Sequence, residues 1–363
     1  MIKILHVISD KNIGGAGKLL LNLLSSGDRE RFCFSVAVPV GSLLAPRLRA
    51  LSVEVIESDM KLSSLVRIIG RVKPQVVHTH AAAEARVAAR LCGVRVTVNT
   101  RHCADCLPTA HGIGKRVAVR LFDALFTSCT VATAHYVRRV LREEGIPDRK
   151  IVTILNGSRP LACLSDEKRA QVRRALGYSE RDVLVGMVAR LERGKGHEYF
   201  IQAASICRES CPSVKFLIAG NGTMERELKN LAKGLDNLSF LGFVDDVTEI
   251  MNILDMNVNC SYISETSSLS LSESMSVGAV PVVSDCGGNA FMAKGCGVIV
   301  PSKDSRALAL AIMELAAADA KRAHLSTLAR ARFAAEFDAA RMAEQTENLY
   351  MHLTKLLDTR CKM

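Results

Sequence analysis

The sequence predicts an α/β protein made of two parallel-sheet domains in succession. In each half, short β-branched runs alternate with amphipathic stretches, a pattern typical of parallel sheets with helices on both faces. A polar, helix-poor passage near Asn156–Ser165 separates the halves. The 363 residues suit two domains, and 48% hydrophobic with 23% charged residues is typical of a well-packed, water-soluble protein.

The first domain is expected over residues 1–162. Runs of Ile, Val and Phe predict its strands, and apolar residues at helical spacing predict its helices. The strands are Ile2–Ser9, Phe32–Pro39, Val53–Ile56, Val76–Thr79, Val94–Thr100 and Ile151–Leu155, and the helices are Ala16–Leu24, Leu43–Leu51, Leu62–Arg71, Ala83–Leu91, Lys115–Phe126 and Val137–Glu144. This alternation indicates a Rossmann-like unit.

The second domain is expected over residues 163–340, where the alternation begins again. Its strands are Val183–Ala189, Lys215–Ala219, Leu238–Leu241, Met256–Cys260, Val280–Ser284 and Val298–Val300, and its helices are Glu198–Glu209, Met224–Lys233, Val247–Leu254, Leu269–Ser276 and Ser305–Ala317. The Ala-rich tail from Ala320 to Leu357 is predicted to be helical. Two open parallel sheets bind ligands at the carboxyl ends of their strands, so we expect a shared crevice.

The net charge of +11 comes from the first half of the chain. Residues 1–160 carry 24 Lys and Arg against 12 Asp and Glu, whereas the remainder is close to neutral. This asymmetry favours an anionic membrane surface as partner, with ordinary solubility as the alternative. Nucleic acid is disfavoured because the chain has no Trp, 4% aromatic residues and no recognisable nucleic-acid-binding module. The basic residues expected on one face are Lys115, Arg116, Arg120, Arg138, Arg139 and Arg142.

The sequence predicts neither a membrane span nor a metal site. No stretch supplies the ~18–20 apolar residues of a spanning helix, and Met1–Ser9 is too short for a signal peptide. We therefore expect a cytoplasmic protein, peripheral on the inner membrane face if its basic half binds lipid. The scattered cysteines indicate reduced thiols. The compact group of His102, Cys103, Cys106 and His111 lacks a second pair at zinc-site spacing.

Two glycine-containing loops are candidate phosphate sites. Gly14-Gly15-Ala16-Gly17-Lys18 opens the first helix, whose amides favour an anion, although a tight turn alone explains the glycines. It matches neither the Walker loop nor the dinucleotide fingerprint. Arg190 and Lys195 flank a second loop, after the first strand of the second domain. Two cations there suit a diphosphate, and the alternative is solvated surface charge.

The segment Glu265–Glu273 is the most informative one. Glu265 is predicted at a strand-to-helix turn and Glu273 two helical turns later, with the amides of Thr266–Leu269 between them. Carboxylates accept hydrogen bonds from sugar hydroxyls and helix-start amides bind phosphate, so this segment could bind a sugar nucleotide. The alternative is two exposed helical glutamates.

These motifs together resemble the retaining GT-B glycosyltransferases of the broad glycosyltransferase family four, which includes sucrose-phosphate synthases and many bacterial lipopolysaccharide, capsule and exopolysaccharide enzymes. The resemblance spans nearly the whole chain. It rests on Gly14-Gly15, Val77-His78-Thr79-His80, Thr100-Arg101-His102, Ile154-Leu155-Asn156-Gly157, Arg190 with Lys195, Gly220-Asn221-Gly222, and Glu265 with Glu273.

The resemblance implies two Rossmann-like domains facing across a deep cleft, the first binding the acceptor and the second the donor, with the C-terminal helix of 341–363 packing back on the first. It implies a retaining, metal-independent hexosyltransferase without a cofactor, whose donor is a UDP-sugar or a GDP-sugar. The acceptor would be a glycan, a lipid-linked precursor or lipid A-core in cell-surface polysaccharide synthesis.

The resemblance also assigns roles to residues. His102 and Glu265 would be catalytic, with His102 near the transferring carbon and Glu265 on the sugar hydroxyls. Glu273 would bind the ribose, and Arg190 with Lys195 the diphosphate. The other donor-binding positions would be Gly15, Asn221, Gly222, Thr266, Ser267, Ser268 and Leu269. His78, His80, His111 and His135 are also candidate site residues, but most of them are interpreted as structural and His102 alone is preferred.

Two departures from the family pattern leave alternatives open. Thr266-Ser267-Ser268 replaces the usual Gly-Phe-Gly, and Ala290-Phe291 replaces the Pro-Glu that often follows Gly-Gly-Asn. The first change keeps amide and hydroxyl donors at the helix start. The second removes a carboxylate and leaves the sugar and base unassigned. The alternatives are a related GT-B enzyme, either an epimerase or a phosphorylase, and a sugar-nucleotide-binding regulator without activity.

Overall fold

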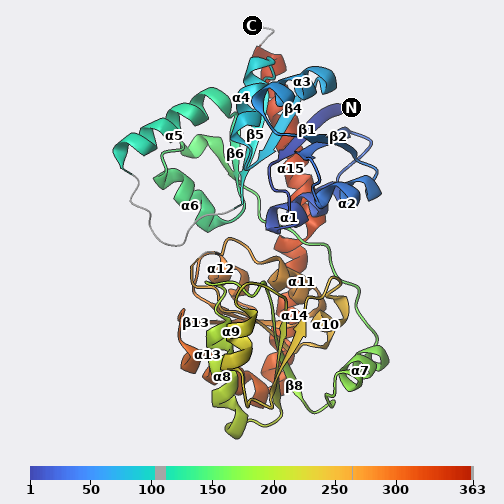
Figure 1. The fold of residues 1–363 in the computed structure, drawn as a ribbon, viewed down its shortest axis with the longest axis vertical. Helices are drawn as coiled ribbons and strands as arrows, with labels where there is room; N and C mark the ends of the chain where they lie inside the picture. The colour runs from blue at the N-terminus through green and yellow to red at the C-terminus, as the bar shows by residue number, and fades with distance from the viewer. Residues whose placement is uncertain (103–111, 264, 361–363) are drawn as a thin grey trace. The chain divides into compact units, whose positions relative to one another are not determined.

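The computed structural model describes residues 1–102, 112–263 and 265–360. Their contacts define two compact units, one of residues 1–102, 112–158 and 339–360, and one of residues 159–263 and 265–338. Each unit contains one parallel sheet with helices around it (Figure 1). No helix of the described residues is long and apolar enough to cross a membrane.

The first unit contains a seven-stranded sheet in the order β3-β2-β1-β4-β5-β6-β7. Its strands are β1 (Ile2–Ile8), β2 (Phe32–Pro39), β3 (Glu54–Ser58), β4 (Val76–His80), β5 (Val96–Arg101), β6 (Cys129–Ala132) and β7 (Ile151–Thr153). Its helices are α1 (Gly15–Ser25), α2 (Leu44–Ala50), α3 (Leu62–Val72), α4 (Ala83–Leu91), α5 (Ile113–Phe126), α6 (His135–Glu143) and α15 (Ala339–Arg360). The central strand β4 is buried along its whole length, as a strand covered on both faces must be.

The second unit repeats the plan with six parallel strands in the order β10-β9-β8-β11-β12-β13. The strands are β8 (Val183–Val188), β9 (Val214–Ala219), β10 (Leu238–Gly242), β11 (Met256–Asn259), β12 (Val280–Ser284) and β13 (Val298–Val300). The helices are α7 (Asp166–Ala175), α8 (His197–Ser210), α9 (Glu225–Leu231), α10 (Thr248–Ile253), α11 (Leu269–Val277), α12 (Asn289–Ala293), α13 (Ser305–Ala317) and α14 (Asp319–Arg332). The predicted α/β class and the two parallel sheets are confirmed.

The tail is helical as the sequence predicts, but it is interrupted once. After α14, residues Phe333–Phe337 form a turn of π-helix, and the extended backbone of Asp338 ends it. The chain then returns to the first unit, where the Ala339 amide donates to the Ser158 carbonyl and α15 packs on α1 (Figure 1). Buried Tyr350 of α15 binds His78 of β4 through its hydroxyl. An Ala-rich composition favours helix on both sides of the break and so does not reveal it.

Three further elements were absent from the sequence prediction. Strand β6 is only four residues long, and its β-branched residues Thr130 and Val131 form too short a run to predict a strand. Helix α12 has only five residues. Helix α7 is strongly polar, yet it carries ordinary start signals, because Ser165 caps it by accepting from the Lys168 amide and Asp166 follows in the first turn.

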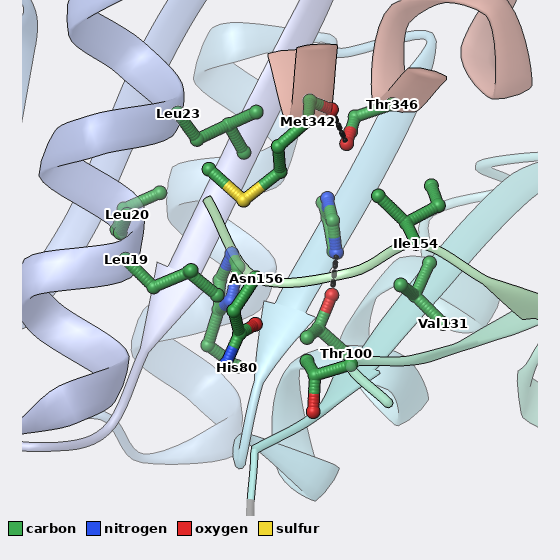
Figure 2. A pocket seen from close by; sticks show the side chains of 12 residues that line it. Leu19, Leu20, Leu23, His80, Thr100, Val131, Ile154, Asn156, Met342 and Thr346 are labelled. Carbon is green, nitrogen blue, oxygen red and sulfur yellow. Dashed lines mark hydrogen bonds between the residues drawn. The ribbon is translucent and has the colours of Figure 1, made fainter. Parts of the chain in front are cut away.

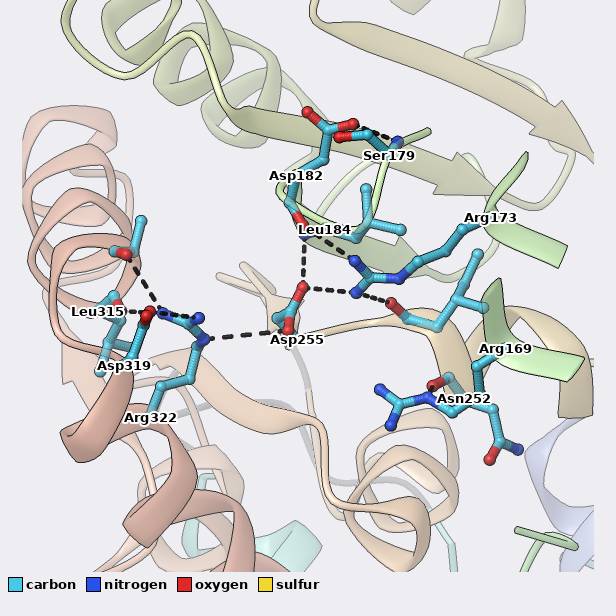
Figure 3. Close-up of polar contacts among 12 residues, drawn as sticks. Arg169, Arg173, Ser179, Asp182, Leu184, Asn252, Asp255, Leu315, Asp319 and Arg322 are labelled. Carbon is cyan, nitrogen blue, oxygen red and sulfur yellow. Dashed lines mark hydrogen bonds and ion pairs between the residues drawn. The ribbon is translucent and has the colours of Figure 1, made fainter. Parts of the chain in front are cut away.

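Asp255 ties the second unit together at the amino end of β11 (Figure 3). Its carboxylate accepts from the Leu184 amide of β8 at 2.8 Å and from Arg173 of α7 at 2.8 Å, and it lies 3.9 Å from Arg322 of α14. Arg173 is nearly buried and also donates to the Ile253 carbonyl. A paired and hydrogen-bonded carboxylate of this kind, half-buried here, fixes the neighbouring strands at the sheet edge opposite the candidate site.

Candidate functional site

The strand order of each sheet marks where a ligand would bind. Successive strands are added toward one edge of the sheet and then toward the other. The switch lies between β1 and β4 in the first unit and between β8 and β11 in the second. In open parallel sheets, ligands bind beyond the carboxyl ends of the strands at such a switch. The segments leaving β8 and β11 contain Arg190, Lys195 and Glu265, so the topology brings these three predicted residues to one sheet edge.

The loop carrying Lys195 is fixed against the end of β11. Gly194 and Gly196 have φ of +90° and +83°, a conformation that favours glycine. A Cβ on Gly196 would lie 2.2 Å from the Cys260 carbonyl oxygen, so no larger residue fits. The Tyr262 amide donates to the Gly194 carbonyl at 2.9 Å. These contacts hold the Lys195 loop against residues 260–262, which precede Glu265 in the chain. Arg190, by contrast, is exposed.

Glu265 is held by three donors that converge on its Oε2. Lys195 Nζ lies at 2.9 Å, Ser261 Oγ at 3.0 Å and Asn259 Nδ2 at 3.3 Å. The Asn259 amide oxygen in turn accepts from Nδ2 of buried Asn289 at 3.3 Å. Only 10% of the Glu265 side chain and 26% of the Lys195 side chain are exposed. Such an arrangement fixes a carboxylate in one orientation before any ligand arrives.

The segment after Glu265 opens α11 as the sequence suggests. Ser268 is the N-cap, and its hydroxyl accepts from the Leu271 amide at 3.3 Å. Thr266 and Ser267 precede the cap and are half-buried. The helix then extends from Leu269 and carries Glu273, also half-buried, in its second turn. The structure thus places the amides and both predicted carboxylates on one strand-to-helix connection.

The loop Gly220–Gly222 packs on the backbone of the Arg190 loop. Gly220 has a φ of +145°, and a Cβ on Gly222 would lie 2.4 Å from the Leu191 carbonyl oxygen. The Leu191 amide donates to the Asn221 carbonyl at 2.8 Å. Close backbone approach therefore explains the glycines here, and Asn221 is exposed beside the Arg190 loop.

Two predicted site residues, Gly15 and His102, lie in the first unit. Gly15 is the exposed first residue of α1, where a Cβ would meet no atom within 4 Å, so no local packing requires a glycine. His102 follows β5 and is half-buried, and its Nε2 lies 2.8 Å from His80 Nδ1. His135 is exposed at the start of α6. Cys103, Cys106 and His111 lie outside the described residues.

The histidines of the first sheet form a buried cluster. His80 Nε2 lies 3.1 Å from His6 Nδ1, and the two nitrogens of His78 bind Tyr350 and Thr100. Among the described residues, His6, His78 and His80 are a group whose ligand atoms lie within 4.8 Å of one another, as a metal site would require. Apart from His6 Nε2, the nitrogens of these three histidines bond other imidazoles or hydroxyl groups, so the cluster is a hydrogen-bond network.

Burial keeps these histidines neutral. It lowers the pKa of His6 to about 3, with a further contribution from the charge of Arg29, and it lowers the pKa of His102 to about 4. Burial also lowers the pKa of His78 and His80 well below the usual value, and neighbouring imidazoles add to the effect. An imidazole that stays neutral at physiological pH can donate from one nitrogen and accept at the other.

A small cavity lies beside the histidine cluster (Figure 2). Its volume is about 20 Å³, close to the space of one water molecule and far too small for a sugar. Its lining residues are Leu19, Leu20, Leu23, His78, His80, Thr100, Val131, Thr133, Ile154, Asn156, Met342 and Thr346. Asn156, from the predicted Ile154–Gly157 motif, is buried and lines this cavity.

Several residues that contact the predicted site residues were not identified from the sequence. Asn259 and Ser261 hold Glu265: Asn259 ends buried strand β11 and Ser261 lies two residues beyond it. With Asn257 they place polar residues at alternate positions, and that alternation was the available signal. His6 stands in the buried part of the first strand, between Leu5 and Val7, where a buried polar residue requires a partner. His80 ranked below His102 among the candidate histidines, and the structure bonds His80 Nδ1 to His102 Nε2.

Comparison with known proteins agrees with this arrangement. The family model described as "Glycosyltransferase Family 4" matches residues 23–159, and the model described as "Glycosyl transferases group 1" matches residues 182–318. A Bacillus subtilis protein named as the glycosyltransferase EpsD is 26% identical, with 69% of this chain and 70% of that protein covered. An Escherichia coli protein named UDP-Gal:alpha-D-GlcNAc-diphosphoundecaprenol alpha-1,3-galactosyltransferase is 27% identical, with 81% and 82% covered.

Solved structures share the fold. HepE of Anabaena, solved in complex with UDP, superposes with a TM-score of 0.86 at 20% identity, covering 97% of this chain and all of that chain. Sucrose-phosphate synthase of Thermosynechococcus elongatus superposes with a TM-score of 0.77 at 17% identity, covering 98% and 100%. The two family models lie one on each unit, and the same two-sheet architecture recurs in these enzymes. The chain therefore belongs to the GT-B glycosyltransferases of the family-four type, which use nucleotide-sugar donors.

Proposed function

We propose that this glycosyltransferase is a retaining, metal-independent hexosyltransferase of cell-surface polysaccharide or lipopolysaccharide synthesis. The observation that carries the proposal is the Lys195–Glu265 pair, a cation and a preoriented carboxylate that lie 2.9 Å apart at the switch in strand order of the second sheet. The carboxylate suits the hydroxyls of a donor sugar and the cation suits its diphosphate.

The positions of Lys195 and Arg190 support metal independence. A diphosphate leaves with developing negative charge, which Lys195 and Arg190 can stabilise as a bound metal would in other enzymes. In the retaining reaction, the acceptor oxygen bonds the anomeric carbon on the face from which the phosphate oxygen departs. The departing phosphate takes the acceptor proton. Glu265 orients the sugar, Glu273 binds the ribose, and His102 assists at the reacting carbon.

UDP is the nucleotide that we favour over GDP. The E. coli relative carries UDP-Gal in its name, and HepE was solved with UDP and with UDP-glucose. The remaining donor contacts are assigned to Gly15, Asn221, Gly222, Thr266, Ser267, Ser268 and Leu269. A lipid-linked acceptor is favoured because the E. coli relative is named for a diphosphoundecaprenol substrate.

A two-stage experiment tests the proposal. Thermal unfolding is measured with UDP, GDP and a panel of their sugars, since a ligand bound by the folded state raises its stability. The best donor is then incubated with undecaprenol-linked acceptors and EDTA, and the anomeric configuration of the product is read by NMR. Retention with full activity in EDTA supports the proposal. An inverted product, or activity abolished by EDTA and restored by a divalent cation, contradicts it.

We also propose that the first unit binds the cytoplasmic face of an anionic membrane. Helix α5 exposes Val117, Leu121 and Leu125 at four-residue spacing, with exposed fractions of 50%, 58% and 62%. Lys115, Arg116 and Arg120 of the same helix are also exposed. An apolar strip beside basic residues suits an anionic lipid surface.

Helix α6 contributes less to this surface than its sequence suggests. Arg138 forms a two-pronged ion pair with Asp148, at 3.1 and 2.9 Å, and Arg142 lies 3.7 Å from the same carboxylate. We therefore expect Leu121→Ser with Leu125→Ser to reduce sedimentation with phosphatidylglycerol vesicles. The control Leu310→Ser, at an exposed leucine of the second unit, should leave it unchanged. Equal sedimentation of all three proteins would contradict the proposal.

A further inference from the structure

Three histidines from neighbouring segments of the first sheet form a hydrogen-bonded chain that ends at His102. His6 lies on β1, His80 on the adjacent β4, and His102 directly after β5. His6 Nδ1 is 3.1 Å from His80 Nε2, and His80 Nδ1 is 2.8 Å from His102 Nε2. His6 and His80 are buried, with 0% and 1% exposure, so neither exchanges this bond for water.

Counting protons restricts the chain to two arrangements. A neutral imidazole carries one proton, and each hydrogen bond uses one. In the first arrangement, His102 donates to His80 and His80 to His6, which leaves an N–H on His6 Nε2. In the second, His6 donates to His80 and His80 to His102, which leaves His6 Nε2 bare and places the His102 proton on Nδ1. The state of His6 therefore determines the tautomer of His102.

The surroundings of His6 favour the second arrangement. His6 Nε2 is buried and has no hydrogen-bond partner among the described residues. The Arg29 guanidinium lies over the Phe34 ring, 5.1 Å from its centroid, and that ring is 5.9 Å from the His6 ring. A positive charge nearby disfavours an unpaired N–H and favours a lone pair at that nitrogen. His78 does not compete, because both of its nitrogens bind hydroxyl groups.

We propose that His80, supported by His6, is a positioning residue that holds His102 with its proton on Nδ1, as a hydrogen-bond donor toward the oxygen of a bound sugar. The inference rests on the proposed function in one respect, the part that His102 takes in sugar transfer. The left-handed backbone of Ala81, with φ of +56°, follows His80 directly and ends β4 at this point. Ser9 Oγ donates to the Ala81 carbonyl at 2.7 Å and fixes the turn.

The test reads the tautomer directly, without substrate. Protein labelled with ¹⁵N in its histidine rings is studied by long-range ¹H–¹⁵N NMR, and signals are assigned with single variants. We expect His102 to carry its proton on Nδ1 in the wild type. In His80→Gln, the side-chain amide can replace His80 Nε2 and keep the bond to His6, but no atom replaces His80 Nδ1. His102 then loses its partner in this chain and should populate both tautomers. Wild-type protein with the proton on His102 Nε2, or an unchanged His102 tautomer in His80→Gln, overturns the proposal.

Two further proteins keep the test decisive. Tyr350→Phe perturbs the same buried cluster through His78, outside the chain, and should leave the His102 tautomer unchanged. If His80→Gln does not fold, His6→Phe replaces it. This variant keeps an aromatic ring beside Phe34, and His102 should again populate both tautomers. A His102 tautomer unchanged in His6→Phe overturns the proposal.

Kinetics separate positioning from a general structural effect. His80→Gln should lower kcat by about 10-fold or more with little change in donor KM, as expected for a group acting in the transition state. The double variant His80→Gln/His102→Ala should be no slower than His102→Ala, because the two residues act as one unit. Additive losses overturn the proposal. A wild-type protein that transfers no sugar refutes the proposed function, while the tautomer measurement still decides this inference.

Discussion

The Lys195–Glu265 pair offers a quantitative check on the candidate site. Lys195→Met and Glu265→Gln, singly and together, form a double-mutant cycle that isolates the interaction between the two side chains. The site is largely shielded, with 26% and 10% of the side chains exposed. A hydrogen bond to a charged group in such a setting contributes about 1.5–3 kcal/mol to stability. We therefore expect a coupling energy in that range.

The chain provides a matched control pair in Lys229 and Glu225 on α9. These side chains are closer, at 2.7 Å, but 54% and 39% of them are exposed. Water screens such a pair, so its coupling should be about 0.3–0.5 kcal/mol. If the distance between the charged atoms alone set the coupling energy, the α9 pair would have the larger one. The comparison therefore tests whether burial sets the coupling energy.

The measurement is native-state hydrogen exchange of peptides from β8 and β11, which reports the opening free energy of the second unit separately from the first. Each cycle needs four proteins under identical conditions. A site coupling no larger than that of the α9 pair would refute the reasoning that the site is preorganised by a shielded ion pair.

Three other predictions follow from the structure. The pKa of His6 falls from 6.5 to about 3 on folding and that of His102 to about 4, so the unfolded state binds more protons below pH 6.5 and stability should fall on acidification, by up to about 1.4 kcal/mol per pH unit per histidine. An equal urea midpoint of the first unit at pH 7 and pH 5 would contradict this. Tyr350→Phe leaves His78 Nδ1 without its hydroxyl and should cost about 1–3 kcal/mol, seen as faster hydrogen exchange in α15. Gly222→Ala should shift the Arg190 loop and weaken the thermal stabilisation by UDP, and unchanged stabilisation would show that the close backbone contact is dispensable.

The sequence predicted the fold because its signals are local. Alternating apolar strands and amphipathic helices specify parallel sheets, and every predicted strand is present in the structure. The errors occur where composition is uninformative. The break at Asp338 lies inside a helix-forming stretch, and it arises because the chain leaves one unit for the other there. Helix α7 was missed because its polar residues show no apolar period.

Pairing across strands was harder to predict than individual site residues. Lys195 and Glu265 are separated by seventy positions, and their contact depends on Gly196 lying against the Cys260 carbonyl oxygen. The bond between His80 and His102 likewise follows from the adjacency of β4 and β5, which no local pattern specifies. The family resemblance identified the candidate residues, whereas the residues that they contact depend on which strands are adjacent in the sheet.

The three donors on Glu265 resolve an apparent conflict within the site. Lys195 is paired with this carboxylate, yet the proposed reaction needs the same cation on a diphosphate. A diphosphate carries more negative charge than one carboxylate and can draw Lys195 toward itself. Ser261 and Asn259 would still hold Oε2 of Glu265, so the carboxylate would keep its orientation toward the sugar. The site can therefore give up one contact on binding without losing the geometry that the remaining contacts maintain.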